Sequence, residues 1–146
     1  MERTGDFCLL DCCTTHTILT SKKYFTYLEP SKIQVGTIAG PIKLIEGSGR
    51  ATFTLPNGTN FTVNDALFAP KSRRNLLSFK DIYRHGYDTE SMTENKAKYI
   101  FIVKNIPGKK HFLEKLPYLS SGLHYTYINE IESNMVVNEN PELLTL

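Results

Sequence analysis

The residue with the clearest chemical potential is Asp11, which follows the apolar run Phe7–Leu10 and opens a turn that contains Thr14 and Thr15. A carboxylate held at a strand end by backbone N–H groups and hydroxyls can act as a general base on water. Acid–base hydrolysis by paired carboxylates needs two acids close enough to share a proton. No second Asp in the sequence has a matching context, so a homodimer with Asp11 on its two-fold axis would have to supply it. An ordinary turn or capping aspartate is the alternative interpretation.

The chain has three cysteines, and all lie within one short segment as Cys8, Cys12 and Cys13. An odd, clustered set is not a disulfide framework, so we expect reduced thiols. Together with His16 these cysteines could form a zinc site, but adjacent cysteines point in opposite directions on a strand and no second cluster follows. A nucleophilic cysteine with His16 as its base is a further alternative that lacks a third, orienting group. The sequence therefore predicts no metal and no other cofactor.

Composition and charge limit the class of protein. The chain has 146 residues, of which 40% are hydrophobic and 22% charged, which suits one domain with a buried core. A formal net charge of +2 excludes the strongly basic nucleic-acid binders. The basic cluster Lys71–Arg74 could bind phosphate, but it lacks interleaved aromatic residues and indicates a solvated loop. We therefore expect no nucleic-acid partner for this domain.

No segment looks suited to a membrane or to export. A membrane helix needs about 20 apolar residues, and no run in this sequence approaches that length. Asp11 interrupts the apolar stretch near the N-terminus, which is too short for a secretory signal. The sequence therefore predicts a cytoplasmic protein without a membrane partner.

The elements that position these residues are mostly short strands. Alternating apolar residues and turn signals predict strands over 7–10, 33–37, 42–45, 51–55, 61–69, 99–103, 111–116 and 123–128. Residues 17–19 form a further short apolar stretch. Gly47-Ser48-Gly49 indicates a glycine turn, and Pro56-Asn57-Gly58 a tight hairpin turn. A helical turn capped by Ser21 is expected over residues 21–25.

One longer helix is expected over Asn75–His85, where apolar residues recur at three- and four-residue spacing before Gly86. The chain turns polar and acidic from Asn129 to Leu146, which predicts a linker or tail. These elements predict an all-β fold, a small closed β-barrel with one short α-helix.

The segment Leu10–Leu19 resembles the active-site segment of copia-type retrotransposon aspartic proteases, in which an apolar pair precedes Asp, a small turn, and His. Further stretches of residues 6–137 resemble the family, including its plant elements, in the same order: Gly47–Gly49, Ala66–Pro70, Asn75–Ser78, Gly86-Tyr87, Lys109–Pro117 and Ser121–Tyr127. The resemblance implies a retropepsin-like β-barrel protease domain over residues 6–128. Residues 129–146 would lead toward the place where a pre-integrase region begins.

The function implied by the resemblance is processing of a Gag-Pol polyprotein by peptide-bond hydrolysis. Asp11 would be the catalytic residue, Cys12, Cys13 and Thr14 its active-site turn, and Gly47 and Gly49 a flap-like glycine turn. The enzyme would act as a homodimer on a polyprotein peptide, without a cofactor.

The active-site turn departs from the family at two positions. The family has Ser or Thr and then Gly after the aspartate, and this chain has Cys12 and Cys13. A thiol is only a weak hydrogen-bond donor, and a Cβ in place of glycine restricts tight backbone geometry. We therefore expect a weak or inactive protease. A non-catalytic β-barrel remnant that acts as an interaction or structural domain is the alternative.

Overall fold

The computed structural model describes residues 5–37, 40–119 and 122–131. Its strands are β1 (Asp6–Asp11), β2 (Ile18–Leu19), β3 (Phe25–Thr37), β4 (Gly40–Thr54), β5 (Asn60–Phe68), β6 (Asn75–Ser78), β7 (Asp88–Glu94), β8 (Ala97–Ile106), β9 (Lys109–Pro117) and β10 (His124–Ile128). A 3₁₀ turn, η1 (Lys22–Tyr24), and one α-helix, α1 (Phe79–Arg84), complete the described elements. The predicted all-β class with one short helix is confirmed.

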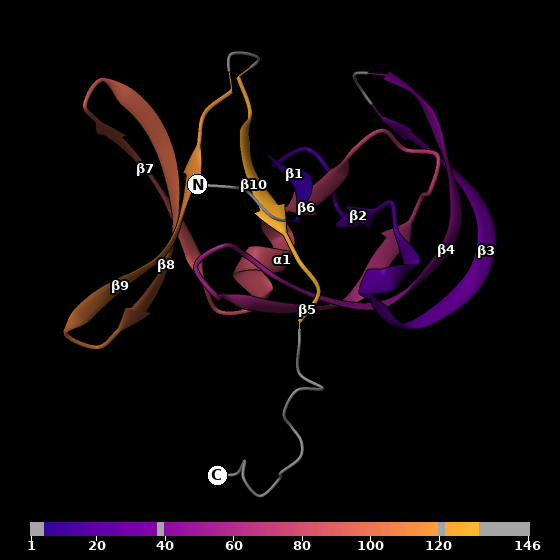
Figure 1. Cartoon of the computed structure of the whole chain (residues 1–146), viewed down its shortest axis with the longest axis horizontal. Helices are drawn as coiled ribbons and strands as arrows, with labels where there is room; N and C mark the ends of the chain where they lie inside the picture. The colour runs from indigo at the N-terminus through magenta and orange to yellow at the C-terminus, as the bar shows by residue number, and fades with distance from the viewer. Residues whose placement is uncertain (1–4, 38–39, 120–121, 132–146) are drawn as a thin grey trace, which may run out of the picture.

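The strands form two sheets (Figure 1). The larger is seven-stranded in the order β10-β1-β6-β2-β5-β4-β3, and the smaller is the meander β7-β8-β9. Strands β10 and β3 are the edges of the larger sheet, and within the described residues no pairing joins them. The closure into a barrel that the sequence predicts is therefore not shown by the strand pairing.

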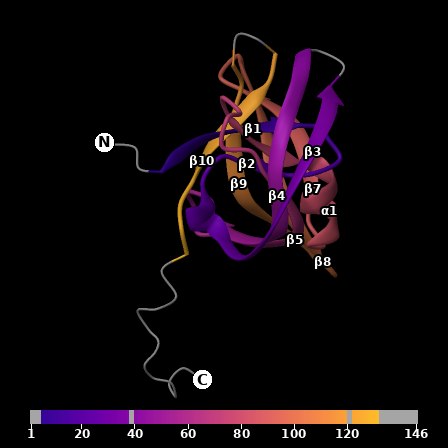
Figure 2. The same ribbon diagram turned by 90° about the vertical axis from the view of Figure 1, so that its right-hand side faces the viewer.

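The N-terminal strand lies inside the larger sheet because it has a partner on each side. It pairs parallel with β6, where Asp11 lies opposite Ser78, and antiparallel with β10, where Leu10 lies opposite His124. Figure 2 shows β1 beside β10, with the long β3–β4 hairpin in front of them. The end of β1 is thus held from both sides, which fixes the position of the turn that follows.

The helix predicted over Asn75–His85 is wrong in its first half. Asn75–Ser78 forms strand β6, and only Phe79–Arg84 is helical. Leu76 and Leu77 pack into different apolar clusters, as successive side chains of a strand do. Ser78 caps the start of the helix, because its hydroxyl accepts the N–H of Lys80.

The glycine turn predicted at Gly47–Gly49 is also wrong, because these residues lie inside β4. A Cβ on Gly49 would stand 2.0 Å from the carbonyl oxygen of Tyr27 on β3, so glycine is needed here for close approach of two backbones. The connection between β3 and β4 falls at residues 38–39, outside the described residues. Strand β7 was not predicted.

Several local predictions are confirmed. Ser21 caps η1 through a hydrogen bond from the N–H of Lys23. The turn at 56–58 joins β4 to β5, with Gly58 at a φ of 94°. The buried side chains of Tyr24, Phe53 and Phe61 form the centre of the main apolar cluster, in which the rings of the two phenylalanines stack at 5.7 Å.

The two sheets are joined by a buried acid. Glu114 on β9 is 5% exposed and accepts the N–H groups of Asn57 and Thr59, each at 3.0 Å. The carboxylate, which belongs to the smaller sheet, therefore supplies hydrogen-bond acceptors for two backbone N–H groups in the turn of the β4–β5 hairpin.

None of the helices in the described residues has the length and apolar character needed to cross a membrane. The predicted tail at 129–146 lies mostly outside the described residues.

Candidate functional site

The turn after β1 carries the predicted catalytic residue. Asp11 is half-buried, and its Oδ1 accepts the backbone N–H of Cys13 at 2.8 Å. This side-chain hydrogen bond to the backbone two residues on forms an Asx turn, which ends the strand and orients the carboxylate. An oriented, accessible carboxylate can take a proton from water, and the same geometry also serves an ordinary turn aspartate.

The rest of the turn is held by hydroxyl groups. Thr14, the last of the predicted turn residues, donates its hydroxyl to the carbonyl of His16 at 2.9 Å. The hydroxyl of Ser78 donates to the carbonyl of Thr14, also at 2.9 Å, from the neighbouring strand end. The loop is therefore tied to β6 as well as to itself, so its position does not depend on the two thiols.

A buried carboxylate lies behind this loop. Asp81 on α1 is 2% exposed and accepts the hydroxyl of Thr17 at 2.7 Å, while Thr17 accepts the N–H of Ser78 at 3.2 Å. Arg84 lies 4.0 Å from the other oxygen of Asp81. The sequence interpretation missed this acid, although Ser78-x-x-Asp81 is a capping-box pattern that could have revealed the helix start.

The thiols of the turn are exposed, and the third thiol is not. Cys12 and Cys13 have their Sγ atoms 3.9 Å apart and are accessible. The hydrogen bond with Cys12, the charge of Cys12 and the charge of Asp11 all raise the pKa of the Cys13 thiol. Cys8 faces the main core, where burial raises the pKa of its thiol to about 12. All three cysteines are free, as the sequence predicts.

The structure does not bring together the four residues of the zinc alternative. Cys8 is enclosed in the core, and His16 bonds through Nδ1 to Thr15 while its Nε2 faces Asp65 at 3.9 Å. A raised pKa at Cys13 also opposes a nucleophilic thiolate paired with His16. Neither alternative for His16 is supported by these contacts.

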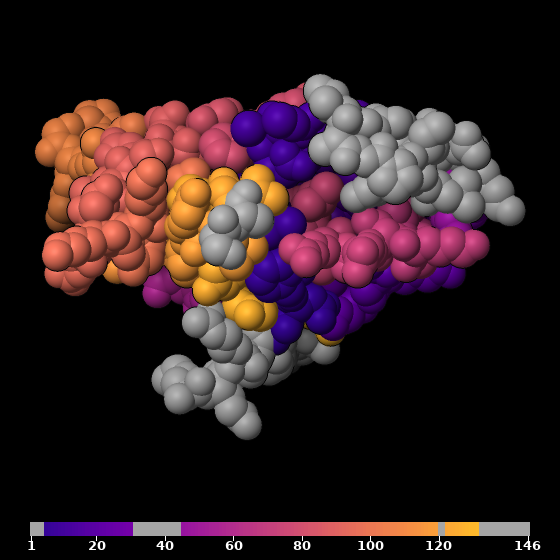
Figure 3. Space-filling model, turned by 90° about the horizontal axis from the view of Figure 1, so that it is seen from above, coloured from indigo at the N-terminus to yellow at the C-terminus, as the bar shows by residue number. Residues whose placement is uncertain are grey.

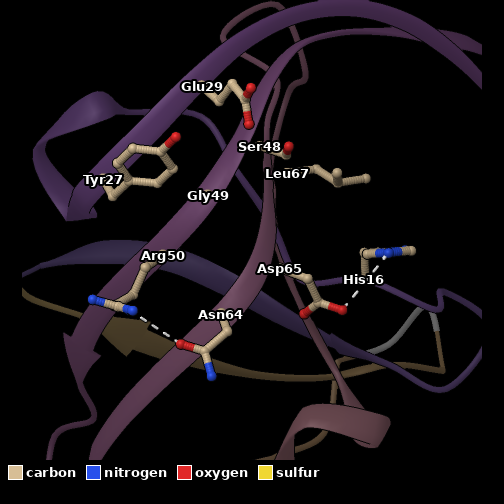
Figure 4. A pocket seen from close by; sticks show the side chains of 9 residues that line it. All are labelled: His16, Tyr27, Glu29, Ser48, Gly49, Arg50, Asn64, Asp65 and Leu67. Atoms are coloured by element: carbon tan, nitrogen blue, oxygen red, sulfur yellow. Dashed lines mark hydrogen bonds and ion pairs between the residues drawn. The ribbon is translucent and has the colours of Figure 1, made fainter.

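A cleft of about 430 Å³ lies next to this loop (Figure 4). Gly49 lies on its β4 wall, whereas Asp11 and Gly47 are not among the residues around it. Its walls carry both signs of charge, which suits a polar chain more than an apolar ligand. The residues that line it are His16, Tyr27, Glu29, Ser48, Gly49, Arg50, Asn64, Asp65 and Leu67.

Asp65 is the charge centre of the cleft. Arg84 donates to its Oδ2 at 3.1 Å, and Lys80 and His16 lie 3.6 and 3.9 Å from the same atom. Burial acts to raise the pKa of Asp65, but the hydrogen bond from Arg84 and the charges of Lys80 and Arg84 outweigh it and hold the pKa below its usual range. No local sequence signal predicts this group, because its members come from three separate segments, β5, α1 and the loop before β2, that only the fold brings together.

The basic cluster Lys71–Arg74 connects β5 to β6. The guanidinium of Arg74 lies 5.5 Å from the ring centre of Phe7, which stacks on Tyr125 at 5.4 Å. The loop therefore has aromatic neighbours in space that the sequence does not interleave with it. Figure 3 shows the surface of β10 adjoining that of the N-terminal strands on this side.

Comparison with known proteins identifies one family. The family model described as the beta-barrel domain of the Pol polyprotein matches residues 8–87. No curated protein and no solved structure gives a significant match.

Proposed function

This chain belongs to the family of Pol polyprotein beta-barrel domains, and from that membership we propose that it is a retropepsin-like aspartic protease domain of a copia-type retrotransposon, of plant origin. Its substrate would be a peptide segment of the Gag-Pol polyprotein. The domain would span residues 6–128, with residues 129–146 as the connection to the next region, and would act in the cytoplasm.

The observation that carries the proposal is the position of Asp11. Its carboxylate lies at the end of a strand with a partner on each side, and a backbone N–H at 2.8 Å orients it. Catalysis by oriented acids depends on such fixed geometry. The half-buried side chain remains accessible to water.

The mechanism requires a homodimer. Two copies of Asp11, one from each chain, would share one proton, because like charges so close cannot both ionise. One carboxylate would take a proton from the attacking water while the other protonates the peptide group. Activity would therefore rise more steeply than linearly with protein concentration.

The thiols at the turn make the expected activity weak or absent. Cys12 and Cys13 occupy the places where the resembling proteases carry a hydroxyl residue and glycine. A displacement of about 1 Å in a catalytic site can reduce the rate about 100-fold, and both halves of a symmetric site would carry the change.

The test is cleavage of a peptide panel by the purified full chain from acidic to neutral pH, next to Asp11→Asn and a double variant, Cys12→Ser with Cys13→Gly. We expect the double variant to cut at least about 100-fold faster than the unmodified chain. Adding Asp11→Asn to the double variant should abolish cleavage. Cleavage that survives Asp11→Asn would refute the assignment of the catalytic residue.

A non-catalytic interaction or structural domain is the second candidate. Two exposed thiols beside Asp11 favour it, because they replace the residues on which the resembling active sites depend. If the unmodified and double-variant chains both fold and neither cuts any peptide, this second function becomes the better account.

A further inference from the structure

The turn after β1 gathers three metal-ligating groups. One ligand atom from each of Asp11, Cys12 and Cys13 lies within 4.8 Å of the others. Among the described residues, this is the only group of three or more His, Cys, Asp or Glu side chains close enough to hold a metal ion. Both cysteines are exposed, so a cation can reach them from solvent. The set differs from the one that the sequence suggests, because Asp11 takes the place of Cys8 and His16.

The spacing of the sulfur atoms matches that of a shared metal ion. Two thiolates bound at about 2.3 Å in a tetrahedral site have their sulfurs about 3.8 Å apart. The Sγ atoms of Cys12 and Cys13 are 3.9 Å apart. A tetrahedral ion could therefore bind both sulfurs without a large movement of the turn.

We propose that Asp11, Cys12 and Cys13 bind one thiophilic divalent cation of the Zn²⁺ type through the carboxylate and two thiolates. Thiolates favour zinc-like ions over Mg²⁺ or Ca²⁺, which prefer oxygen ligands. Three protein ligands leave the fourth position of a tetrahedral ion open to water.

The surroundings of the cluster support this site. The N–H of Cys13 holds one oxygen of Asp11, as hydrogen bonds to metal-binding carboxylates commonly do. Metal binding would release the two thiol protons.

This site goes beyond the proposed protease function and does not depend on it. An Asp11 carboxylate bound to a cation could not serve at the same time as a general base. The two proposals also have different measurements, since metal binding is followed by absorbance and proteolysis by peptide cleavage.

The experiment is a titration of the reduced full chain with Cd²⁺, a spectroscopic probe for zinc-type thiolate sites, under anaerobic conditions. We expect an ultraviolet thiolate-to-metal charge-transfer band that saturates at one ion per chain and is reversed by Zn²⁺. Mg²⁺ should neither produce nor displace the band. The double variant Cys12→Ser with Cys13→Ser should lose it, and Asp11→Asn should weaken Cd²⁺ binding at least about 10-fold.

The matched controls are Cys8→Ala and His16→Ala, which remove the two residues of the other zinc alternative. Both should bind Cd²⁺ as the unmodified chain does. Three results would each overturn the proposal. They are the absence of the band in the unmodified chain, a band that survives the loss of Cys12 and Cys13, and an unchanged Cd²⁺ affinity in Asp11→Asn. If the chain binds Cd²⁺ and neither it nor the variant Cys12→Ser with Cys13→Gly cuts a peptide, the result would support this site and count against the protease.

Discussion

Two neighbouring parallel strands, β1 and β6, end side by side in the larger sheet, but a turn follows β1 and helix α1 follows β6. Asp11, the last residue of β1, lies opposite Ser78, the last residue of β6. A second carboxylate, Asp81, comes three residues after Ser78. Asp81 is 2% exposed and bonded to the hydroxyl of Thr17. Asp11 is half-buried, and the exposed thiols of Cys12 and Cys13 follow it.

The difference separates a structural acid from one that is available for chemistry. A buried carboxylate must be paired, and its removal leaves its donors unsatisfied, so it contributes to stability. A carboxylate at an exposed turn contributes little to stability, because water can replace its partners. The turn after β1 can therefore accept substitutions, while Asp81 in the helix after β6 stabilises the fold.

The largest expected effect is in the reactivity of the thiols. Cys12 and Cys13 should react rapidly with a thiol reagent in the folded chain, and Cys8 should react on the order of 1,000-fold more slowly, because its reaction requires opening of the core. Mass spectrometry of the alkylated chain over time measures each site. Unfolding in urea is the control, in which all three should react at similar rates. Fast labelling of Cys8 under native conditions would contradict the burial of β1.

The second effect is on stability. Asp81→Ala should lower the free energy of unfolding by about 2–3 kcal/mol, since it removes a buried hydrogen bond to a charged group. Asp11→Ala is the matched variant and should cost no more than about 1 kcal/mol. Urea unfolding followed by circular dichroism measures both. Equal losses of stability in the two variants would remove the distinction between the two carboxylates.

A smaller loss of stability is expected when the hydroxyl that donates a hydrogen bond to Asp81 is removed. Thr17→Val keeps the shape of the side chain but removes its bonds to Asp81 and to the N–H of Ser78, at a cost of about 1–2 kcal/mol. Thr15→Val, at an exposed position of the same loop, should change the free energy of unfolding by less than about 0.5 kcal/mol. In a chain that already carries Asp81→Ala, Thr17→Val should lower the free energy of unfolding by less than it does alone. If the losses from the two substitutions simply add, the two residues do not share a hydrogen-bond network.

The smallest expected effect concerns pH. Burial, with the nearby charge of Lys98, lowers the pKa of His124 from its usual 6.5. The unfolded chain then binds this proton more readily than the folded chain does, so stability should fall as the pH drops below about 6.5. Because His124 lies opposite Leu10, this loss acts on the strand that presents Asp11.

Unfolding free energies of the unmodified chain and His124→Gln, from about pH 8 to about pH 5, measure the effect. The variant should show a flatter profile over this range. Parallel profiles would assign the acid sensitivity to other groups.

Local signals allowed much of the fold to be predicted. The Asn57-Gly58 turn and the cap at Ser21 depend on a few adjacent residues, and both are confirmed. The turn at Asp11 is local for the same reason, since an apolar strand gives way directly to small polar residues.

Strand pairing between residues distant in the sequence explains the predictions of secondary structure that were wrong. Leu76 and Leu77 fit a helical spacing, but parallel pairing with β1 makes them part of a strand. Glycine signals either a turn or a close approach of backbones, and only the position of Tyr27 on β3 decides between them at Gly49.

The candidate site shows the same limit. The place of Asp11 was predictable, whereas its buried counterpart was not, because the Thr17–Asp81 bond joins residues 64 positions apart. The cleft around Asp65 likewise depends on the register of three strands.

The position of β1 between β6 and β10 also has a consequence for the order of folding. During synthesis, the first strand must wait for its second partner at His124–Ile128, so the sheet stays incomplete until nearly the whole domain has left the ribosome. Contacts this distant in sequence slow folding. The family match ends at residue 87, before β10 begins. A chain without β10 would leave β1 as an open edge that another chain could pair with.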